Sequence, residues 1–233
     1  MDAIVDLVRF LTDPQNWRGT AGVPARTLEH LGYVLAASGL AALIALPTGL
    51  LLGHTRRYEI LVTQITNAGR AIPTLGILIL AFTFFGIRPL PVILALTAMA
   101  IPPILVNTYV GVQAVDPEVV DAARGVGMTG LQVLARVEVP VATPLIMAGV
   151  RTSVVQVVAT ATLAAVISLG GLGRFIIDGL QQDVLARVLA GAVLVATLAV
   201  LMEWGFAGLQ RVLTPRGLRT EASVRDLQGP SGV

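Results

Sequence analysis

Long runs of apolar residues, separated by short polar stretches, make up most of the chain. Five of these runs reach roughly the 20 residues that a helix needs to cross a bilayer. They cover residues 31–52, 60–85, 90–115, 144–168 and 188–209. All are rich in Leu, Ala, Val and Ile, with internal Gly and Pro, which membrane helices tolerate. The pattern predicts an all-α membrane protein with about five transmembrane helices, whose membrane domain covers residues 31–210.

Residues 1–30 have a different pattern. Their apolar positions recur at helical spacing, at Ile4, Leu7, Val8 and Leu11. This spacing predicts a short amphipathic helix on the membrane surface, followed by a loop at Asp13 and Pro14. A signal peptide is not expected, because acidic residues stand where its basic residues would be and no apolar core precedes residue 31.

Composition supports a membrane protein. Hydrophobic residues make up 55% of the chain and charged residues 13%, whereas soluble domains carry about 25% charged residues. The mean hydropathy is +0.82. The chain has no cysteine, which excludes a disulfide scaffold. Its basic residues are all arginines and are scattered without a basic stripe, so the net charge of +2 does not indicate nucleic-acid binding.

The arginines also orient the spans, because basic residues gather in cytoplasmic loops. An odd number of spans places the two termini on opposite sides. With the 53–60 loop, the 116–144 loop and the C-terminal tail inside, nine arginines lie inside and six outside, while Arg70 belongs to neither side. We therefore expect the N-terminus outside and the polar tail, residues 211–233, in the cytoplasm.

The 116–143 segment is polar and lies between two strong spans. Asp116 is a candidate N-cap for one short helix. Thr129 and Gln132 form a capping box for a second one, and Gly127 interrupts the chain between them. Two capped helices with a glycine hinge are compatible with an ordinary connection or with a docking surface for a cytoplasmic partner.

The second short helix has an apolar face and a defined end in the sequence. Leu131, Leu134 and Ala135 fall on one side of a regular helix. We expect Pro140 to end this helix and Pro144 to open the next span, because proline removes a helical hydrogen bond.

The same segment resembles the EAA loop of ABC importer permeases. The family pattern is Glu-Ala-Ala, three residues, Gly, nine residues, then Ile-x-Leu-Pro. The corresponding residues here are Asp121-Ala122-Ala123, Gly127 and Val137-x-Val139-Pro140, at the same spacing. The departures are conservative, with Asp for Glu, Val for Ile and Val for Leu.

Flanking motifs are similar to the quaternary-amine, or osmoprotectant, branch of these permeases, whose usual substrates are glycine betaine, choline, carnitine and proline betaine. The motifs are Ala71-Ile72-Pro73-Thr74-Leu75, Pro102-Pro103-Ile104, Asn107-Thr108-Tyr109-x-Gly111, Ala122-Ala123-Arg124-Gly125-Val126-Gly127-Met128-Thr129 and Gly170-Gly171-Leu172-Gly173. The resemblance covers roughly residues 25–210. It implies the type I ABC importer (MetI-like) permease fold, in a bacterial plasma membrane.

The resemblance also implies partners. In this family the EAA loop is a coupling helix that fits a cleft on a cytoplasmic ATPase dimer. A binding protein delivers the solute outside, and a second permease subunit, the same chain or a paralogue, completes the pathway. Carried over by position, the ATPase-coupling residues are Asp121, Ala122, Ala123, Gly127, Met128, Thr129, Leu131 and Pro140. The identity of the solute stays open, because specificity resides largely in the binding protein.

We expect the chain to be a transport subunit and not an enzyme. It has no phosphate-binding loop and no lysine, so ATP would be bound by the partner ATPase and no cofactor is expected here. No metal site is expected, because cysteine is absent and the two histidines, His30 and His54, stand at opposite ends of the first span.

Candidate residues for the pathway or its gate lie within and beside the spans. They are Arg70, Pro73, Asn107, Tyr109, Gly170, Gly171 and Gly173. Burying an arginine in a span costs at least roughly 2.5–3.5 kcal/mol. Arg70 therefore either lines a pathway or bonds carbonyls that Pro73 leaves free. Asn107 and Tyr109 either contact the solute or hydrogen-bond to other helices.

Three further features have two interpretations each. The 170–173 sequence is an external gate or a flexible loop. Arg151 and Glu203 are pathway residues, or they lie near the cytoplasmic interface and extend their charges into it.

Two other functions compete with that of an osmoprotectant permease. One is an ABC permease for another small solute, such as an amino acid. The other is an ion-coupled secondary transporter, which normally places a carboxylate within its spans; the first four spans contain none. A structural membrane protein would not explain the EAA spacing.

Overall fold

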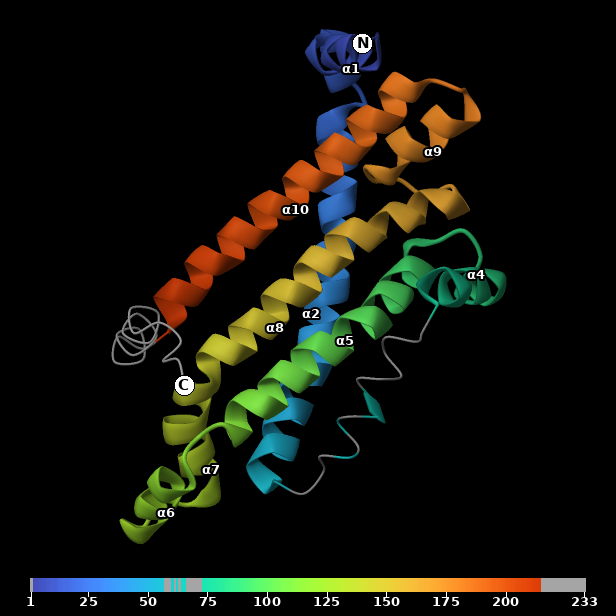
Figure 1. Ribbon diagram of the computed structural model, residues 1–233. Coiled ribbons are helices and arrows are strands. Elements are labelled where there is room, and N and C mark those ends of the chain that lie inside the picture. Colours follow the sequence, from blue (N-terminus) through green and yellow to red (C-terminus); the bar gives the residue numbers. More distant parts are fainter. Residues whose placement is uncertain (1, 57–59, 61, 63, 66–72, 215–233) are drawn as a thin grey trace, which may run out of the picture.

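The computed structural model describes residues 2–56, 60, 62, 64, 65 and 73–214. Within these residues the chain is a bundle of helices without strands (Figure 1). Four helical stretches are long and apolar enough to cross a membrane, at Val23–Thr55, Pro89–Gln113, Gly130–Ile167 and Leu185–Leu213. The expected all-α membrane fold is confirmed.

α2 (Val23–Thr55) begins earlier than the apolar run at 31–52 predicts. Pro24 stands in its first turn, where a missing N–H breaks no helical bond. Glu29 and His30 are therefore residues of this helix and do not precede it. The helix ends at Arg56, whose φ of 52° lies in the left-handed region.

α4 (Thr74–Phe85) is an apolar helix of 12 residues, shorter than a span needs. It represents the second half of the expected span at 60–85. Arg70 and most of the first half lie outside the described residues, so the two interpretations of Arg70 stay open. α5 (Pro89–Gln113) covers the next expected span almost entirely.

Residues Gly130–Ile167 form one continuous helical stretch. Its parts are α7 (Gly130–Val133), η2 (Leu134–Glu138), α8 (Val139–Thr160) and η3 (Ala161–Ile167). The expectation that Pro140 ends one helix and Pro144 opens another is wrong. η2 is a π-helical turn, in which the Val139 N–H donates to the Leu134 carbonyl five residues back. Because Pro140 follows in the first turn of α8, the widened turn accommodates its missing N–H without a break.

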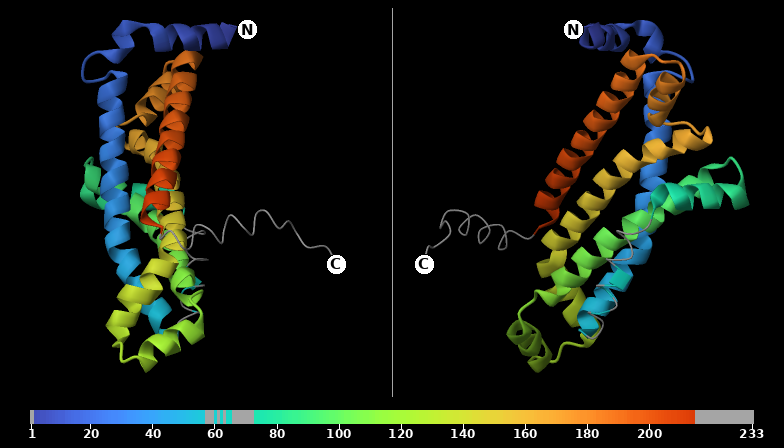
Figure 2. Two further views of the ribbon diagram at one scale, coloured as in Figure 1. Left: turned by 90° about the vertical axis from the view of Figure 1, so that its left-hand side faces the viewer. Right: turned by 45° about the vertical axis from the view of Figure 1, so that its right-hand side comes forward.

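The remaining elements lie at the two ends of the bundle (Figures 1 and 2). α6 (Pro117–Gly125) and α7 lie at one end, which we call the α6 end. The other end of the bundle, which we call the α1 end, contains α1 (Asp2–Thr12), η1 (Pro14–Trp17) and α9 (Gly173–Gln181). α10 (Leu185–Leu213) runs from the α1 end along α8. α1 crosses the bundle at a steep angle to the long helices (Figure 2).

α5 packs along both α2 and α8, and small residues allow the close approach. A Cβ added to Gly49 of α2 would lie 2.8 Å from the Cβ of Thr108 on α5. One added to Gly149 of α8 would lie 2.6 Å from the Cβ of Asn107 on α5. These two glycines fix the spacing of the three central helices.

Candidate functional site

The 116–143 segment contains two capped helix starts at the α6 end, as its sequence predicts, but only α6 is a separate short helix, because α7 continues through η2 into α8. The Asp116 carboxylate accepts a hydrogen bond from the Glu118 N–H at 2.8 Å, which caps α6. The Thr129 hydroxyl accepts one from the Gln132 N–H at 3.4 Å, and the Gln132 side chain accepts one from the Thr129 N–H at 2.8 Å. The capping box is confirmed.

Gly127 provides the bend between the two helices. Its φ is +89°, in a region that side-chain-bearing residues rarely adopt. Just after it, the Met128 N–H donates to the Ala123 carbonyl at 3.1 Å, so the chain turns back on α6. Asp121 and Ala122 are exposed on α6, whereas Ala123 is buried beneath them.

A small hydrophobic cluster, separate from the main core, holds the two helices together. Its buried members are Val115, Val120, Ala123 and Val133, with Met128 and Val137 packed against them. Three large apolar residues of these two helices and the bend between them are exposed: Val119, Val126 and Leu131. The segment is thus built around a core of its own and presents an uncovered apolar surface.

The expected single apolar face of the second helix is absent. Leu134 is buried, whereas Leu131 and Ala135 are exposed. The π-helical turn that starts at Leu134 changes the angular spacing of the side chains, so the regular helical repeat no longer applies.

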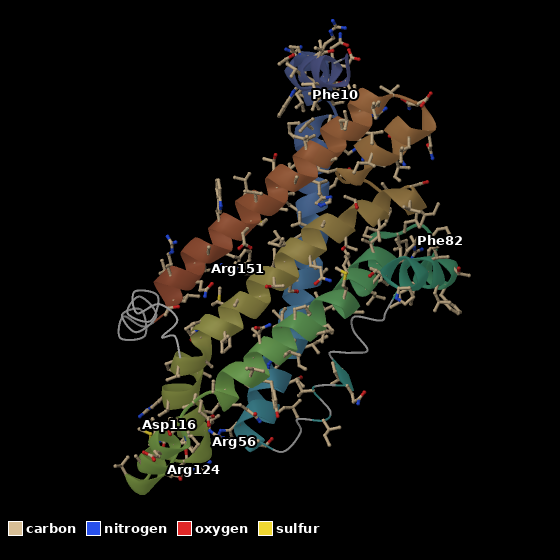
Figure 3. All side chains as sticks on the ribbon, viewed as in Figure 1. Phe10, Arg56, Phe82, Asp116, Arg124 and Arg151 are labelled. Atoms are coloured by element: carbon tan, nitrogen blue, oxygen red, sulfur yellow. The ribbon has the colours of Figure 1, made fainter. Side chains whose placement is uncertain are left out.

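The end of α2 contacts one residue on each side of the two capped helices, and the sequence pattern does not reveal these contacts. His54 Nδ1 lies 2.6 Å from Glu138 Oε2. Since an ionised carboxylate can only accept, the imidazole N–H is the donor. Two residues further along α2's end, the Arg56 guanidinium donates to the Val115 carbonyl at 2.9 Å. In Figure 3, Arg56 is at the α6 end, where Asp116 and Arg124 are also labelled.

Asn107 and Tyr109 are placed within the bundle by α5. Asn107 Nδ2 donates to the Pro103 carbonyl at 2.8 Å, so its hydrogen bond lies within α5 and does not join two helices. Tyr109 is buried, and its hydroxyl accepts a hydrogen bond from Gln113 at 2.7 Å, also within α5. Pro73 is exposed at the start of α4.

The 170–173 sequence forms a turn that is bonded to α2. Gly171 has a φ of +94°, and its N–H donates to the Glu29 carboxylate at 2.8 Å. His30 Nε2 lies 2.9 Å from the Val158 carbonyl near the end of α8. Gly173 starts α9 and packs so close to Thr162 that no side chain would fit. These contacts do not fit a flexible loop, because Gly171 is held against α2 and Gly173 lies against Thr162.

Arg151 and Glu203 form an ion pair between α8 and α10, with 3.3 Å between Nε and Oε1. Both side chains are partly exposed. Figure 3 shows Arg151 between the two helices, well away from the α6 end. Each of these two charged side chains is therefore paired with an opposite charge on the neighbouring helix.

Across the part of the chain that the structure describes, no group of three or more His, Asp or Glu side chains is placed to hold a metal ion.

The chain is similar to a known protein family and to several known permeases. Residues 45–216 match the family described as binding-protein-dependent transport system inner membrane component. The carnitine transport permease protein OpuCB of Listeria monocytogenes is 40% identical over 83% of this chain and 89% of its own length. The osmoprotectant import permease protein OsmW of Salmonella typhimurium is 33% identical over 92% of this chain and 100% of its own.

Two further similarities concern a choline system and the fold. The choline transport system permease protein OpuBB of Bacillus subtilis is 36% identical over 83% of this chain and 89% of its own. Among solved structures, an inward-facing MetNI methionine ABC transporter contains a chain with a TM-score of 0.73 and 22% identity. The match covers 88% of this chain and 100% of that chain, and at this identity it supports the fold alone.

Proposed function

The chain belongs to the family of binding-protein-dependent transport system inner membrane components, and on this premise we propose that it imports a quaternary ammonium osmoprotectant. It is a multi-pass permease subunit of an ABC transporter. The observation that carries the substrate class is that relatives at 33–40% identity over most of the chain are permeases for carnitine, osmoprotectants and choline. Glycine betaine, choline, carnitine and proline betaine are the candidate solutes.

The experiment is uptake of labelled glycine betaine, choline and carnitine by cells that lack this chain. We expect uptake of at least one solute to fall and to return when the intact chain is supplied. Unchanged uptake of all three would overturn the substrate class. A loss of uptake of an amino acid instead would favour the alternative solute.

The 116–143 segment is the proposed contact with a cytoplasmic ATPase. It carries the EAA spacing, it is held rigid by two caps and a separate cluster, and it leaves Val126 and Leu131 exposed at about four-fifths of their surface, 79% and 76%. Exposed apolar patches rimmed by polar residues mark interaction sites. ATP hydrolysis would then take place on the partner, and this chain would convert the partner's motion into movement of the spans.

The segment's role places it in the cytoplasm, and with it the α6 end. The α1 end, with the turn at 170–173, would then face the binding protein, and a second permease subunit would complete the pathway. Purification of the tagged chain tests this arrangement, because it should recover an ABC ATPase. Recovery of the intact chain without any ATPase, under conditions that preserve membrane complexes, would count against it.

A further inference from the structure

α2 has polar contacts at both of its ends, and each contact holds a segment implicated in transport. At the α6 end, His54 is hydrogen-bonded to Glu138, and Arg56 donates a hydrogen bond to the Val115 carbonyl. Val115 and Glu138 flank the capped helices. At the α1 end, Glu29 bonds Gly171 and His30 bonds Val158. One helix of 33 residues, about 50 Å long at 1.5 Å per residue, joins the two regions.

Glu138 reaches α2 because of the π-helical turn. It is the last residue of η2 and is 1% exposed. In a regular α-helix each residue advances by about 100°, so the extra residue of a π turn redirects every side chain that follows. Such turns are rare and are frequently found at functional sites. Here the turn directs a carboxylate into the interior, where His54 supplies a hydrogen bond.

The three central helices are connected to the 116–143 segment in different ways. α5 leads into it at Val115, and α8 continues from it without interruption through η2. α2 is joined to it only by side chains, among the contacts that the structure describes. The two hydrogen bonds are those of His54 and Arg56, and Gly130 lies against the His54 ring, where an added Cβ would be 3.4 Å from Nε2.

We propose that His54 is a positioning residue that joins α2 to the 116–143 segment, so that α2 moves with it and carries the displacement to the turn at 170–173. The inference rests on the proposed contact between this segment and an ATPase. A displaced segment would pull α5 and α8 through the backbone, and α2 directly through His54, Glu138 and Arg56 in addition to the packing of α2 on α5. Loss of the His54–Glu138 bond therefore weakens the direct link between the segment and α2, so that less of the motion driven by ATP reaches the turn.

The test replaces both partners at once. Removing only His54 leaves a buried carboxylate without its donor, which is destabilising for reasons unrelated to transport, whereas apolar replacement of both partners is tolerated far better. The informative variant is therefore His54→Leu with Glu138→Leu. His54→Gln alone is the conservative counterpart, because a glutamine amide can donate to the Glu138 carboxylate. Thr55→Ala is the matched control, since among the described residues the Thr55 hydroxyl donates to the Leu52 carbonyl of its own helix.

The readout is the amount of labelled choline and glycine betaine imported per ATP hydrolysed by the purified complex, with its binding protein, in vesicles. This ratio does not depend on how much complex assembles. We expect the double leucine variant to retain its ATPase and hydrolyse ATP, while the ratio falls by roughly five-fold or more, the lower range of coupling between distant sites. His54→Gln and Thr55→Ala should keep the wild-type ratio.

A double leucine variant with the wild-type ratio would overturn the inference, as would an equal loss in His54→Gln and the double variant. Failure of the proposed function would look different. In that case the wild-type chain itself would recover no ATPase, or its uptake would not depend on ATP.

Discussion

The carboxylate of Glu29 accepts a hydrogen bond from the backbone N–H of Gly171, 142 positions away in the chain, at 2.8 Å. The same oxygen, Oε2, lies 2.8 Å from the Arg26 guanidinium, so the carboxylate is fixed on its own helix. The next residue, His30, is fully buried and bonds the Val158 carbonyl. Two adjacent residues of α2 therefore hold the end of α8 and the turn that follows it.

Replacing Glu29 by alanine should loosen this turn. The partly buried Gly171 N–H would lose its acceptor, which costs about 1–3 kcal/mol. Glu29→Gln keeps an acceptor at the same distance and should cost much less. The melting temperature of the purified protein should therefore fall clearly for Glu29→Ala and little for Glu29→Gln. Equal melting temperatures for both variants and the wild type would show that this bond does not hold the turn.

Replacing Gly127 by aspartate should abolish transport while the chain stays in the membrane. The φ of +89° is strained for any residue with a side chain, by roughly 1–2 kcal/mol for left-handed backbone. The bend between α6 and α7 would shift, and ATP hydrolysis would continue without uptake. Gly125→Ala is the matched control, because Gly125 is in α6 and an added Cβ meets nothing within 4 Å. Wild-type uptake by Gly127→Asp would refute the role given to the 116–143 segment.

Replacing Gly149 by alanine should push α8 away from α5. An added Cβ would lie 2.6 Å from the Asn107 Cβ and 2.8 Å from the Pro103 carbonyl oxygen. Overpacking of this kind typically costs about 1–3 kcal/mol. Gly205→Ala is the comparison, since nothing lies within 4 Å of its added Cβ on α10. Thermal unfolding of the two variants in the same detergent should separate them, and equal stability would mean that the helices can move apart freely.

Local signals in the sequence predicted much of this fold. The apolar runs predict the long helices, and the caps at Asp116 and Thr129 act within a few residues of their partners. Gly127 interrupts the chain where a left-handed backbone is needed. All of these depend on neighbours close in the chain, which a single sequence displays directly.

The features that the sequence did not predict have physical causes of their own. Pro140 is normally a helix terminator, but the π-helical turn before it removes the conflict, and nothing in the sequence marks that turn. The His54–Glu138 and Glu29–Gly171 bonds join residues 84 and 142 positions apart. Their partners become visible only when the helices are packed.

In the proposed function, the energy of ATP hydrolysis drives solute import by this chain. The most direct measurement is uptake of labelled choline or glycine betaine in cells depleted of ATP, with the ion gradients across the membrane clamped at their normal values. We predict that uptake by this chain stops when ATP is depleted and persists when ATP is kept and the gradients are collapsed. Uptake that continues without ATP and stops when the gradients are collapsed would identify an ion-coupled carrier and contradict import driven by ATP.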